Sequence, residues 1–207
     1  MPRAAIRAAV LDYGNVLSLE QEGESVRRLE GLTGAAAAVF AAAYWRHRPP
    51  YDRGELSGEA YWQRVGEELG MELAPERIAE LTREDAASWV RLNDRMMRWL
   101  RALLDAGVPT AILSNMARDT WALAGASFEG VAFVTLSFEV GMVKPEPGIY
   151  LACLSALGVE PAEALFVDDR RENVEAARAL GMHALVFEDE DSLAAELQRR
   201  GLGWPLP

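Results

Sequence analysis

Six polar side chains fall where short apolar runs of the sequence end, or in the loops that follow them. They are Asp12, Ser114, Asn115, Lys144, Asp168 and Asp169. Three carboxylates, a lysine and a small hydroxyl suit phosphoryl transfer, which uses a carboxylate nucleophile, a divalent metal ion, and a cation with hydrogen-bond donors around the phosphate oxygens. This chemistry requires a fold that brings all six side chains to one place.

Asp12 lies within the stretch "LDYGNVL". The apolar run before it is typical of a strand buried on both faces, and the pair Gly14-Asn15 is typical of a sharp turn. Asp12 would then lie at the carboxyl edge of a sheet, where open α/β proteins keep their sites. For a lone aspartate, capping of the next turn is the simpler interpretation, so the choice depends on the rest of the chain.

Strand and helix patterns alternate from about Asp94 onward. "DRMMRWLRALLDAG" predicts an amphipathic helix with Asp94 as its N-cap and Gly107 as its C-terminal stop. The strands predicted beyond it are "VPTAILSN", "VAFVTLS", "ALFVDD" and "HALVFED", and the helices are "PGIYLACLSALG", "RENVEAARALG" and "DSLAAELQRRG". This alternation predicts an α/β fold with a doubly wound parallel sheet, whose carboxyl edge would gather the six polar side chains.

The segment 18–94 shows helical patterns without convincing strands. "AAAAVFAAAYW" has high helix propensity, "RPPYDRGELS" indicates a turn-rich break, and Ser57 is a candidate N-cap for "GEAYWQRVGEELG". We therefore expect an all-helical cap subdomain over residues 18–94. It would be inserted into an α/β core domain formed by residues 1–17 and 95–207.

Four motifs of the sequence resemble those of the haloacid dehalogenase superfamily, in the branch whose helical cap follows the first motif. They are "VLDYGNVL", "ILSN", "GMVKPEPGIY" and "LFVDDRRENVEAARALGM", and they occur in family order across nearly the whole chain. The fourth is the most specific, because Asn173, Ala177 and Gly181 follow "VDD" at the family's spacing. The resemblance implies a Rossmann-like core and a Mg²⁺-dependent hydrolase that works through an aspartyl intermediate.

The resemblance also implies roles for the residues around the metal ion. Asp12 is implied as the nucleophile and a metal ligand, and the backbone carbonyl of Gly14 as a second ligand. Asp169 is implied to bind Mg²⁺ directly, and Asp168 to bind it directly or through water.

For the phosphate group, the resemblance implies contacts from Ser114 and from the backbone N–H of Asn115. Lys144 is implied to pair with the phosphate and with Asp12, which makes Asp12 and Lys144 the expected catalytic residues.

Gly14 stands where phosphatases that resemble this chain usually carry a second aspartate, which protonates the leaving oxygen and activates water. Positioned proton transfer is typically worth about 10²–10⁴-fold in rate. Either another group supplies the proton, or the enzyme is slow, or it is not a phosphatase. A branch with the same D-x-G-N-V form is regarded as phosphatase-like. Gly14 also fits a purely structural alternative, a turn that needs a positive φ.

Two other functions compete with a phosphatase. A 2-haloacid dehalogenase needs no metal, but its resemblance requires an aromatic residue at position 14 and a single acid in the fourth motif, where this chain has Asp168 and Asp169. A non-catalytic descendant would bind a phosphorylated ligand or a protein partner, which Gly14 favours. Several costly charges at one sheet edge instead indicate a ligand there. The double acid favours metal, and hence phosphate.

Composition argues against several classes of partner. The 207 residues include 21 Lys and Arg against 32 Asp and Glu, a net charge of −11, so we expect no binding to nucleic acid or anionic membranes, which depends on clustered positive charge. No apolar run approaches the ~20 residues of a membrane span, and we recognise no secretory signal. The single Cys153 suits a reducing compartment. We expect a cytoplasmic protein, monomeric or homodimeric.

Substrate choice is expected to depend on the cap. The candidate contacts to the leaving group are Arg46, His47, Arg48 and Tyr51. In the alternative, Tyr44 and Trp45 belong to the core and the arginines to a solvated face. The tryptophans are likewise more typical of core and subdomain-contact positions than of a binding platform. By family analogy, a cap closing over a small cleft favours a small phosphorylated metabolite, such as a sugar phosphate.

Overall fold

Five parallel strands form the central sheet in a computed structural model, which describes residues 5–207. The strands are β1 (Ala8–Leu11), β2 (Thr110–Ser114), β3 (Phe133–Leu136), β4 (Ala164–Asp168) and β5 (His183–Val186). Their order is β3-β2-β1-β4-β5, so the chain runs outward from β1 in one direction and then crosses to the other side. The reversal lies between β1 and β4, and open α/β sheets bind their ligands at such a switch point.

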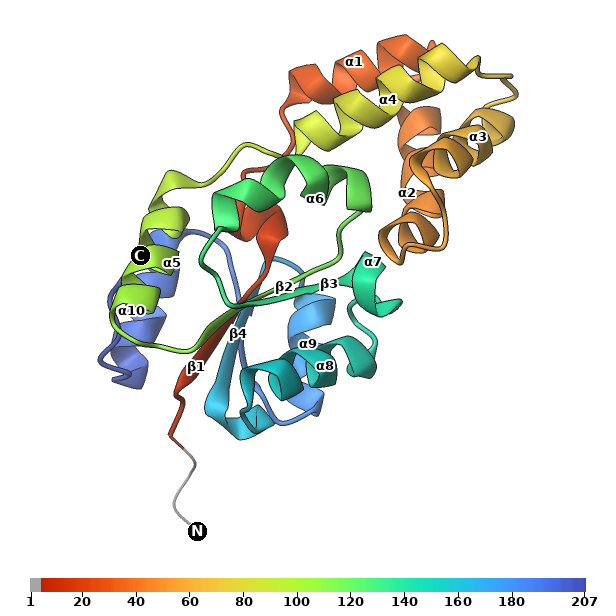
Figure 1. The fold of residues 1–207 in the computed structure, drawn as a ribbon. Helices are drawn as coiled ribbons and strands as arrows, with labels where there is room; N and C mark the ends of the chain where they lie inside the picture. The colour runs from red at the N-terminus through yellow and green to blue at the C-terminus, as the bar shows by residue number, and fades with distance from the viewer. Residues whose placement is uncertain (1–4) are drawn as a thin grey trace.

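Helices cover both faces of this sheet (Figure 1). They are α5 (Asp94–Asp105) and α10 (Glu190–Arg200) on one face, and α8 (Pro147–Leu157) and α9 (Arg171–Ala179) on the other. Ala9 and Leu11 of β1 pack toward the first pair, and Ala8 and Val10 toward the second. The apolar run is thus buried on both sides, as alternation along a central strand requires. The predicted Rossmann-like, doubly wound α/β fold is confirmed.

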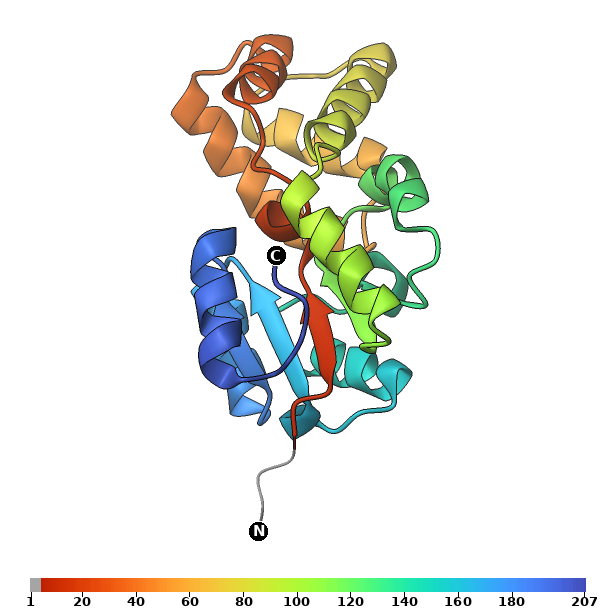
Figure 2. The ribbon, with the colours of Figure 1, turned by 90° about the vertical axis from the view of Figure 1, so that its left-hand side faces the viewer.

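Four further helices pack around a hydrophobic cluster of their own, above the sheet in Figures 1 and 2. They are α1 (Gly23–Thr33), α2 (Ala37–Asp52), α3 (Gly58–Glu68) and α4 (Pro75–Ser88). The two segments that join them to the sheet domain run side by side. The Leu19 N–H donates to the Arg91 carbonyl at 2.8 Å, and the Asn93 N–H to the Leu17 carbonyl at 2.9 Å. The assignment of residues 18–94 as a cap subdomain stays a prediction, with its boundaries beside these connections.

Helix α2 is longer than the sequence predicts. The turn-rich break predicted over "RPPYDRGELS" is present at residues 53–57, between α2 and α3. Its first part is wrong, because α2 continues through Pro49 and Pro50 and ends at Asp52. Prolines remove backbone donors and usually end a helix. Here the last turn is also held by the ion pair between Arg48 and Asp52, at 2.8 Å, and by stacking of Tyr51 on a tyrosine of α3. Tertiary contacts therefore override the local signal.

The helix termini follow the sequence with one correction. The Ser57 side chain caps α3 as predicted, and Gly107 follows the end of α5 with a φ of +71°. Asp94, the predicted N-cap of α5, is instead the first residue of that helix. Asn93 is the N-cap, and its side chain accepts hydrogen bonds from two N–H groups of the first turn. Asn and Asp cap equally well, so propensity does not distinguish these neighbours.

Two short helices at the carboxyl edge of the sheet contact the four-helix group. They are α6 (Arg118–Ala124), which packs on α4, and α7 (Ser137–Val140), which packs on α2. Helix α6 follows β2 and α7 follows β3, so the four-helix group packs against segments that begin at the ends of these two strands.

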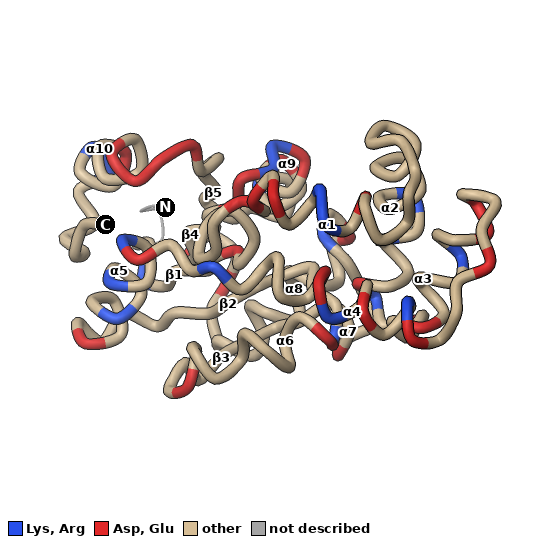
Figure 3. The backbone as a smooth tube through the Cα atoms, turned by 90° about the horizontal axis from the view of Figure 1, so that it is seen from above, with Lys and Arg blue, Asp and Glu red and all other residues tan. Residues whose placement is uncertain are grey.

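Charged residues are distributed over both parts of the molecule. Viewed from above, Lys and Arg positions are interspersed with Asp and Glu along the helices (Figure 3). Within residues 5–207, no helix combines the length and the apolar character needed to cross a membrane. The expected lack of nucleic-acid binding stays a prediction.

Candidate active site

Asp12 lies directly after β1, at the carboxyl edge of the sheet. Its N–H donates to the Val167 carbonyl of β4 at 2.9 Å and extends the strand pairing by one residue. The chain then turns with dihedral angles close to those of a type II turn, at Gly14 (φ −63°, ψ 128°) and Asn15 (φ 56°, ψ 7°). The positive φ belongs to Asn15, so the structural alternative in which Gly14 needs a positive φ is wrong.

Lys144 joins two of the predicted carboxylates. Its Nζ lies 2.6 Å from Asp12 Oδ1 and 2.7 Å from Asp168 Oδ2, and it donates to the Leu113 carbonyl at 3.0 Å. Only 1% of its side chain is exposed. Because an ammonium group has three donors, all of its hydrogen-bonding capacity is used. The position of Lys144 between the two carboxylates is therefore well defined.

Asp168 and Asp169 have different surroundings. Asp168 is buried and accepts from the Arg170 backbone N–H at 2.8 Å and from the Asn173 side chain at 2.9 Å, besides the lysine. Asp169 is only partly buried, and its Oδ2 accepts from Asn15 Nδ2 at 2.8 Å. The sharp turn after β1 thus supplies the side chain that orients the second aspartate of the pair.

Burial and charge shift the pKa values of the site in different directions. Burial raises the pKa of Asp12 well above its usual range, Lys144 opposes this, and the charges of Asp168 and Asp169 add to it. Burial would also raise the pKa of Asp168, but Lys144 and the N–H donors outweigh it and lower that pKa. Burial raises the pKa of Asp169. Burial would lower the pKa of Lys144, but its two carboxylates raise it, so the amine stays charged.

The three carboxylates fit a divalent cation. One oxygen each from Asp12, Asp168 and Asp169 lies within 4.8 Å of the other two. Asp12 Oδ2 and Asp169 Oδ1 accept no hydrogen bond from any residue of 5–207. Carboxylate oxygens are ligands that Mg²⁺ prefers, and a single lysine does not neutralise three of them. The residues present therefore fit Mg²⁺, whereas ligation by the Gly14 carbonyl stays a prediction.

The predicted phosphate contacts Ser114 and Asn115 lie at the end of β2. Ser114 is buried, and its hydroxyl lies 3.4 Å from the Asn115 carbonyl oxygen. The Asn115 side chain accepts from the Lys144 N–H at 2.7 Å and donates to the Lys144 carbonyl at 2.9 Å. This second role of Asn115, fixing the backbone of the lysine, was not apparent from the sequence. Phosphate binding by both residues stays a prediction.

A cavity of about 490 Å³ opens at this site. Its lining comes from the sheet domain and from the four-helix group. On the sheet side the lining includes Asp12, Gly14, Asn15, Asn115, Lys144, Asp169 and Asn173. On the helical side it includes Trp45, Arg48, Pro49, Asp52 and Trp89. A molecule that is held at Asp12 and fills this cavity would therefore also contact α2 and the end of α4.

The residues predicted to contact the leaving group lie in different environments, and not all of them line the cavity. Arg48 lines the cavity and is buried. Arg46 and His47 instead pair with Glu68 of α3, at 3.0 and 2.7 Å. Tyr51 is buried and donates to an aspartate of α6 at 2.8 Å. The alternative of a solvated face is therefore correct for Arg46 and wrong for Arg48.

Two tryptophans line the cavity, whereas the sequence favoured core and subdomain-contact positions for this residue type. Trp45 is 51% exposed, so its alternative placement in the core is wrong. Its ring lies edge-on to that of Trp89, with 6.5 Å between the centroids. Trp62 and Trp99 are fully buried, as expected. Together with Pro49, the two cavity tryptophans give the helical side of the cavity an apolar wall.

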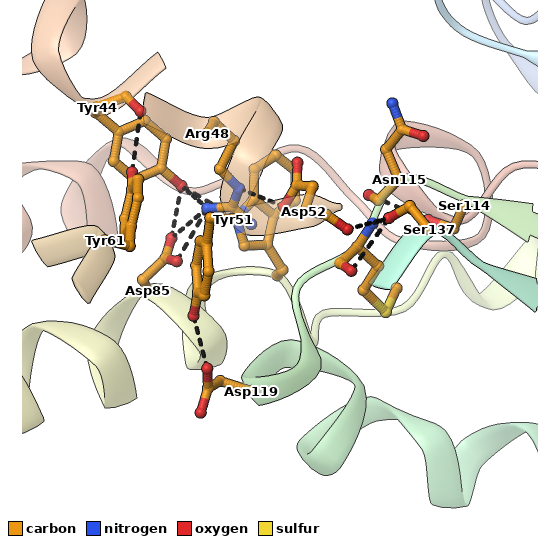
Figure 4. A network of polar contacts seen from close by, with 12 residues as sticks. Tyr44, Arg48, Tyr51, Asp52, Tyr61, Asp85, Ser114, Asn115, Asp119 and Ser137 are labelled. Atoms are coloured by element: carbon orange, nitrogen blue, oxygen red, sulfur yellow. Dashed lines mark hydrogen bonds and ion pairs between the residues drawn. The ribbon is translucent and has the colours of Figure 1, made fainter. Parts of the chain in front are cut away.

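Arg48 also lies at the centre of a buried polar network (Figure 4). Its Nη1 donates to both oxygens of Asp85, at 3.1 and 2.9 Å, and its Nε donates to Asp52 Oδ1 at 2.8 Å. The Tyr44 hydroxyl donates to Asp85 at 2.5 Å and accepts from Arg48. One guanidinium therefore serves two carboxylates. The only sequence signal for this network is the i, i+4 spacing of Arg48 and Asp52.

A family model described as haloacid dehalogenase-like hydrolase matches residues 6–181. The chain is 30% identical to a sesquiterpene phosphatase of Aspergillus oryzae, over 93% of this chain and 95% of that protein. It is 45% identical to flavin mononucleotide hydrolase 1 of Arabidopsis thaliana over 67 residues, which are 32% of this chain and 27% of that protein. The latter match thus spans about a quarter of that relative's length.

A solved structure has a similar fold. It is a HAD family enzyme of Bacteroides thetaiotaomicron in complex with magnesium and inorganic phosphate, with a TM-score of 0.70 and 20% sequence identity. The match covers 91% of this chain and 99% of that chain. At this identity the likeness shows the fold.

Proposed function

The chain belongs to the haloacid dehalogenase-like hydrolase family, and from this premise we propose that it is a Mg²⁺-dependent phosphatase. It hydrolyses a monoester of a small phosphorylated metabolite through an aspartyl-phosphate intermediate. The observation that carries this proposal is the placement of Lys144 between Asp12 and Asp168, with Asp169 beside them and a cavity open to Asp12.

The paired acids favour a phosphatase over a dehalogenase. A halide leaves without phosphate charge to neutralise, so a dehalogenase has no need of a metal ion. Here Lys144 pairs with two of the three carboxylates, Asp12 and Asp168, whereas Asp169 has no such pairing and keeps one oxygen free of hydrogen bonds within residues 5–207. A ligand-binding protein without activity would gain nothing from a buried carboxylate held against a lysine at the cavity floor, because such charges are costly to bury.

The proposed reaction has two displacements at phosphorus. A carboxylate oxygen of Asp12 forms a bond to phosphorus while the ester P–O bond breaks and the alcohol leaves. Water then forms a bond to the same phosphorus, the Asp12–phosphate bond breaks, and the carboxylate is restored. Lys144 places a fixed positive charge where the phosphoryl oxygens develop negative charge. Mg²⁺ held by Asp12, Asp168 and Asp169 would supply further charge stabilisation.

The apolar wall of the cavity bears on the substrate class. Trp45, Pro49 and Trp89 would pack against the flat or apolar face of an organic group, such as a sugar ring or a fused ring system. The sugar phosphate expected from the sequence meets this requirement, and so do flavin and terpenoid phosphates, the classes suggested by the names of two relatives. A screen that includes all three classes distinguishes them.

The proposal is tested by measuring phosphate release from a panel of phosphorylated metabolites, with Mg²⁺ and with a chelator. We expect Mg²⁺-dependent release from at least one monoester, lost in Asp12→Asn, since an amide is neither a good nucleophile nor an anionic metal ligand. Asp105→Asn, an exposed acid at the end of α5, is the matched control. Activity retained in Asp12→Asn, or halide release from a 2-haloacid without Mg²⁺, would contradict the proposal.

A further inference from the structure

We propose that Asp52, the last residue of α2, is the general acid and base of this site. It would do what the second aspartate does in related phosphatases, which this chain replaces by Gly14. The inference rests on the proposed phosphatase function, because it concerns the proton that the alcohol takes when the ester bond breaks. Its support is the position of Asp52, the way the fold anchors it, and the charges around it.

Asp52 lines the same cavity as Asp12 and Lys144. Its Oδ1 accepts from Arg48 Nε at 2.8 Å, whereas its Oδ2 accepts no hydrogen bond from any residue in the described part of the chain. The side chain keeps 13% of its surface exposed, although the residue as a whole is buried. One carboxyl oxygen is thus held in place, and the other is free to exchange a proton with a group in the cavity.

The fold anchors Asp52 to the sheet domain on two sides. Its carbonyl accepts from Ser137 Oγ, which in turn accepts from the Met116 N–H at 2.8 Å (Figure 4). Its neighbour Arg53 pairs with Glu146 at 2.6 Å. Met116 and Glu146 belong to the two loops that carry the predicted phosphate contacts. The end of α2 is therefore fixed relative to the position of the phosphate, as a proton donor must be.

The charges around Asp52 favour a carboxyl group that can hold a proton. Arg48 is shared with Asp85, so two buried carboxylates face one guanidinium. Within residues 5–207, Asp85 accepts three hydrogen bonds and Asp52 accepts one, so Asp52 is the less fully hydrogen-bonded of the two carboxyl groups. Burial raises the pKa of Asp52, Arg48 opposes this, Asp85 adds to it, and Arg170, at the start of α9, opposes it. Ser137, which faces Asp52 from α7, is neutral.

The proton balance of the reaction closes with this residue. In the first displacement, protonated Asp52 gives its proton to the leaving oxygen as the ester bond breaks, so the product is an alcohol. In the second displacement, the Asp52 carboxylate takes a proton from the attacking water as the new P–O bond forms. Asp52 ends the cycle protonated, and the net reaction is ester plus water to alcohol plus phosphate.

Asp52→Asn tests the proposal, because it keeps the shape of the side chain and removes the exchangeable proton. With an aryl phosphate, whose leaving oxygen scarcely needs a proton, we expect a rapid burst of about one phenol per active site and then slow turnover. With an alkyl phosphate we expect formation of the phosphoenzyme to slow by about 10²–10⁴-fold, with no burst. Stopped-flow kinetics and intact mass spectrometry of quenched enzyme measure the two effects.

Two further variants separate chemistry from structure. Glu55→Gln removes an exposed carboxylate that pairs with Arg53 just beyond α2, and we expect it to leave the wild-type kinetics with both phosphates unchanged. Gly14→Asp in the Asp52→Asn background supplies a carboxylate from the other side of the site. Position 14 has an ordinary φ of −63°, and a Cβ there meets no atom within 4 Å. We expect this double variant to recover phosphoenzyme formation and turnover with the alkyl phosphate.

The outcomes distinguish this inference from the proposed function. If wild-type enzyme releases phosphate but Asp52→Asn slows phosphoenzyme formation from the alkyl and aryl phosphates equally, Asp52 is a structural residue and the proposal is overturned. A double variant no faster than Asp52→Asn also overturns it. Thermal unfolding without Mg²⁺ supplies a readout independent of turnover, and we expect Asp52→Asn to match wild type or exceed it. Absence of any phosphatase activity in wild-type enzyme refutes the function itself.

Discussion

The ammonium of Lys144 lies 2.6 Å from Oδ1 of Asp12, and both side chains are almost fully shielded from water. Lys144 is the only lysine of the chain, since the other members of its 21 Lys and Arg residues are arginines. A lysine ammonium is a compact point charge, whereas a guanidinium is a planar fork. From one nitrogen Lys144 reaches Asp12, Asp168 and the Leu113 carbonyl, a geometry that an arginine cannot reproduce.

Lys144→Arg should therefore inactivate the enzyme although it keeps the charge. We expect kcat to fall by about 10²–10³-fold, the usual cost of losing one preorganised donor at a developing negative charge. KM should change less, because the interaction strengthens in the transition state. Steady-state kinetics with an aryl phosphate measure both constants. Arg101→Lys, the reverse exchange on the exposed face of α5, is the control. An unchanged kcat in Lys144→Arg would place this residue outside the chemistry.

Mg²⁺ should stabilise the folded protein through the three carboxylates. A ligand that binds only the native state at about 100 times its Kd adds about 2.7 kcal/mol, which for a chain of this size is a rise in Tm of roughly 5–10 °C. We expect this rise in wild type and not in Asp169→Asn, which replaces a carboxylate ligand by an amide. Scanning calorimetry with Mg²⁺ and with a chelator measures it. A full rise in Asp169→Asn would show that the cation binds elsewhere.

The same variant tests the sign of the pKa shift in metal-free protein. Burial raises the pKa of Asp169 above its value in the unfolded chain, so the native state holds this proton up to a higher pH. The unfolded state then binds fewer protons over that interval, and the free energy of unfolding falls as pH rises through the native pKa. Asp169→Asn removes this contribution. Without metal, its stability relative to wild type should increase from acid to neutral pH, as measured by urea unfolding.

The sheet side of the site was predictable because it depends on local signals. An apolar run followed by a polar residue places Asp12 and the pair Asp168-Asp169 at the carboxyl edge of parallel strands, whatever the details of packing. The switch point between β1 and β4 follows from the connectivity. The sequence did not show that two asparagines hold these residues in place. Asn15 donates a hydrogen bond to Asp169, and Asn115 accepts one from the backbone N–H of Lys144.

The helical side of the site was not predictable in the same way. Arg48 and Asp52 face the cavity because α2 continues through two prolines, and local propensity indicates a break at that point. The network that holds this turn joins α2 to Asp85 in α4, so it depends on tertiary packing. Trp45 resembles a core residue in sequence, yet it is half exposed and lines the cavity. The spacing of residues along one helix does not show which face of that helix lies against the rest of the fold.

The apolar wall should select substrates by the organic group. Trp45→Ala removes an exposed face of the cavity, and loss of roughly 55 Å² of apolar contact at about 25 cal/mol per Å² corresponds to about 1.4 kcal/mol. We expect KM to rise about tenfold for a fused-ring phosphate and to change little for glycerol phosphate. Leu123→Ala, on α6, removes an equally exposed apolar side chain outside the cavity lining and serves as control. Equal rises for both substrates would contradict a role of Trp45 in selection.

Arg48 should be a large contributor to the stability of the four-helix group. Arg48→Met keeps the apolar stem but leaves Asp52 and Asp85 buried without their cation, and breaking a buried pair in this way typically costs about 3–5 kcal/mol. Among residues 5–207 the exposed neighbour Arg46 pairs only with Glu68, so Arg46→Met should stay within about 0.5 kcal/mol of wild type. Urea unfolding measures both variants. Asp85→Asn in the same chain should recover part of the loss, because it removes one of the two carboxylates that Arg48 pairs with. No recovery in this double variant would mean that packing of the arginine stem, and not its charge, stabilises the network.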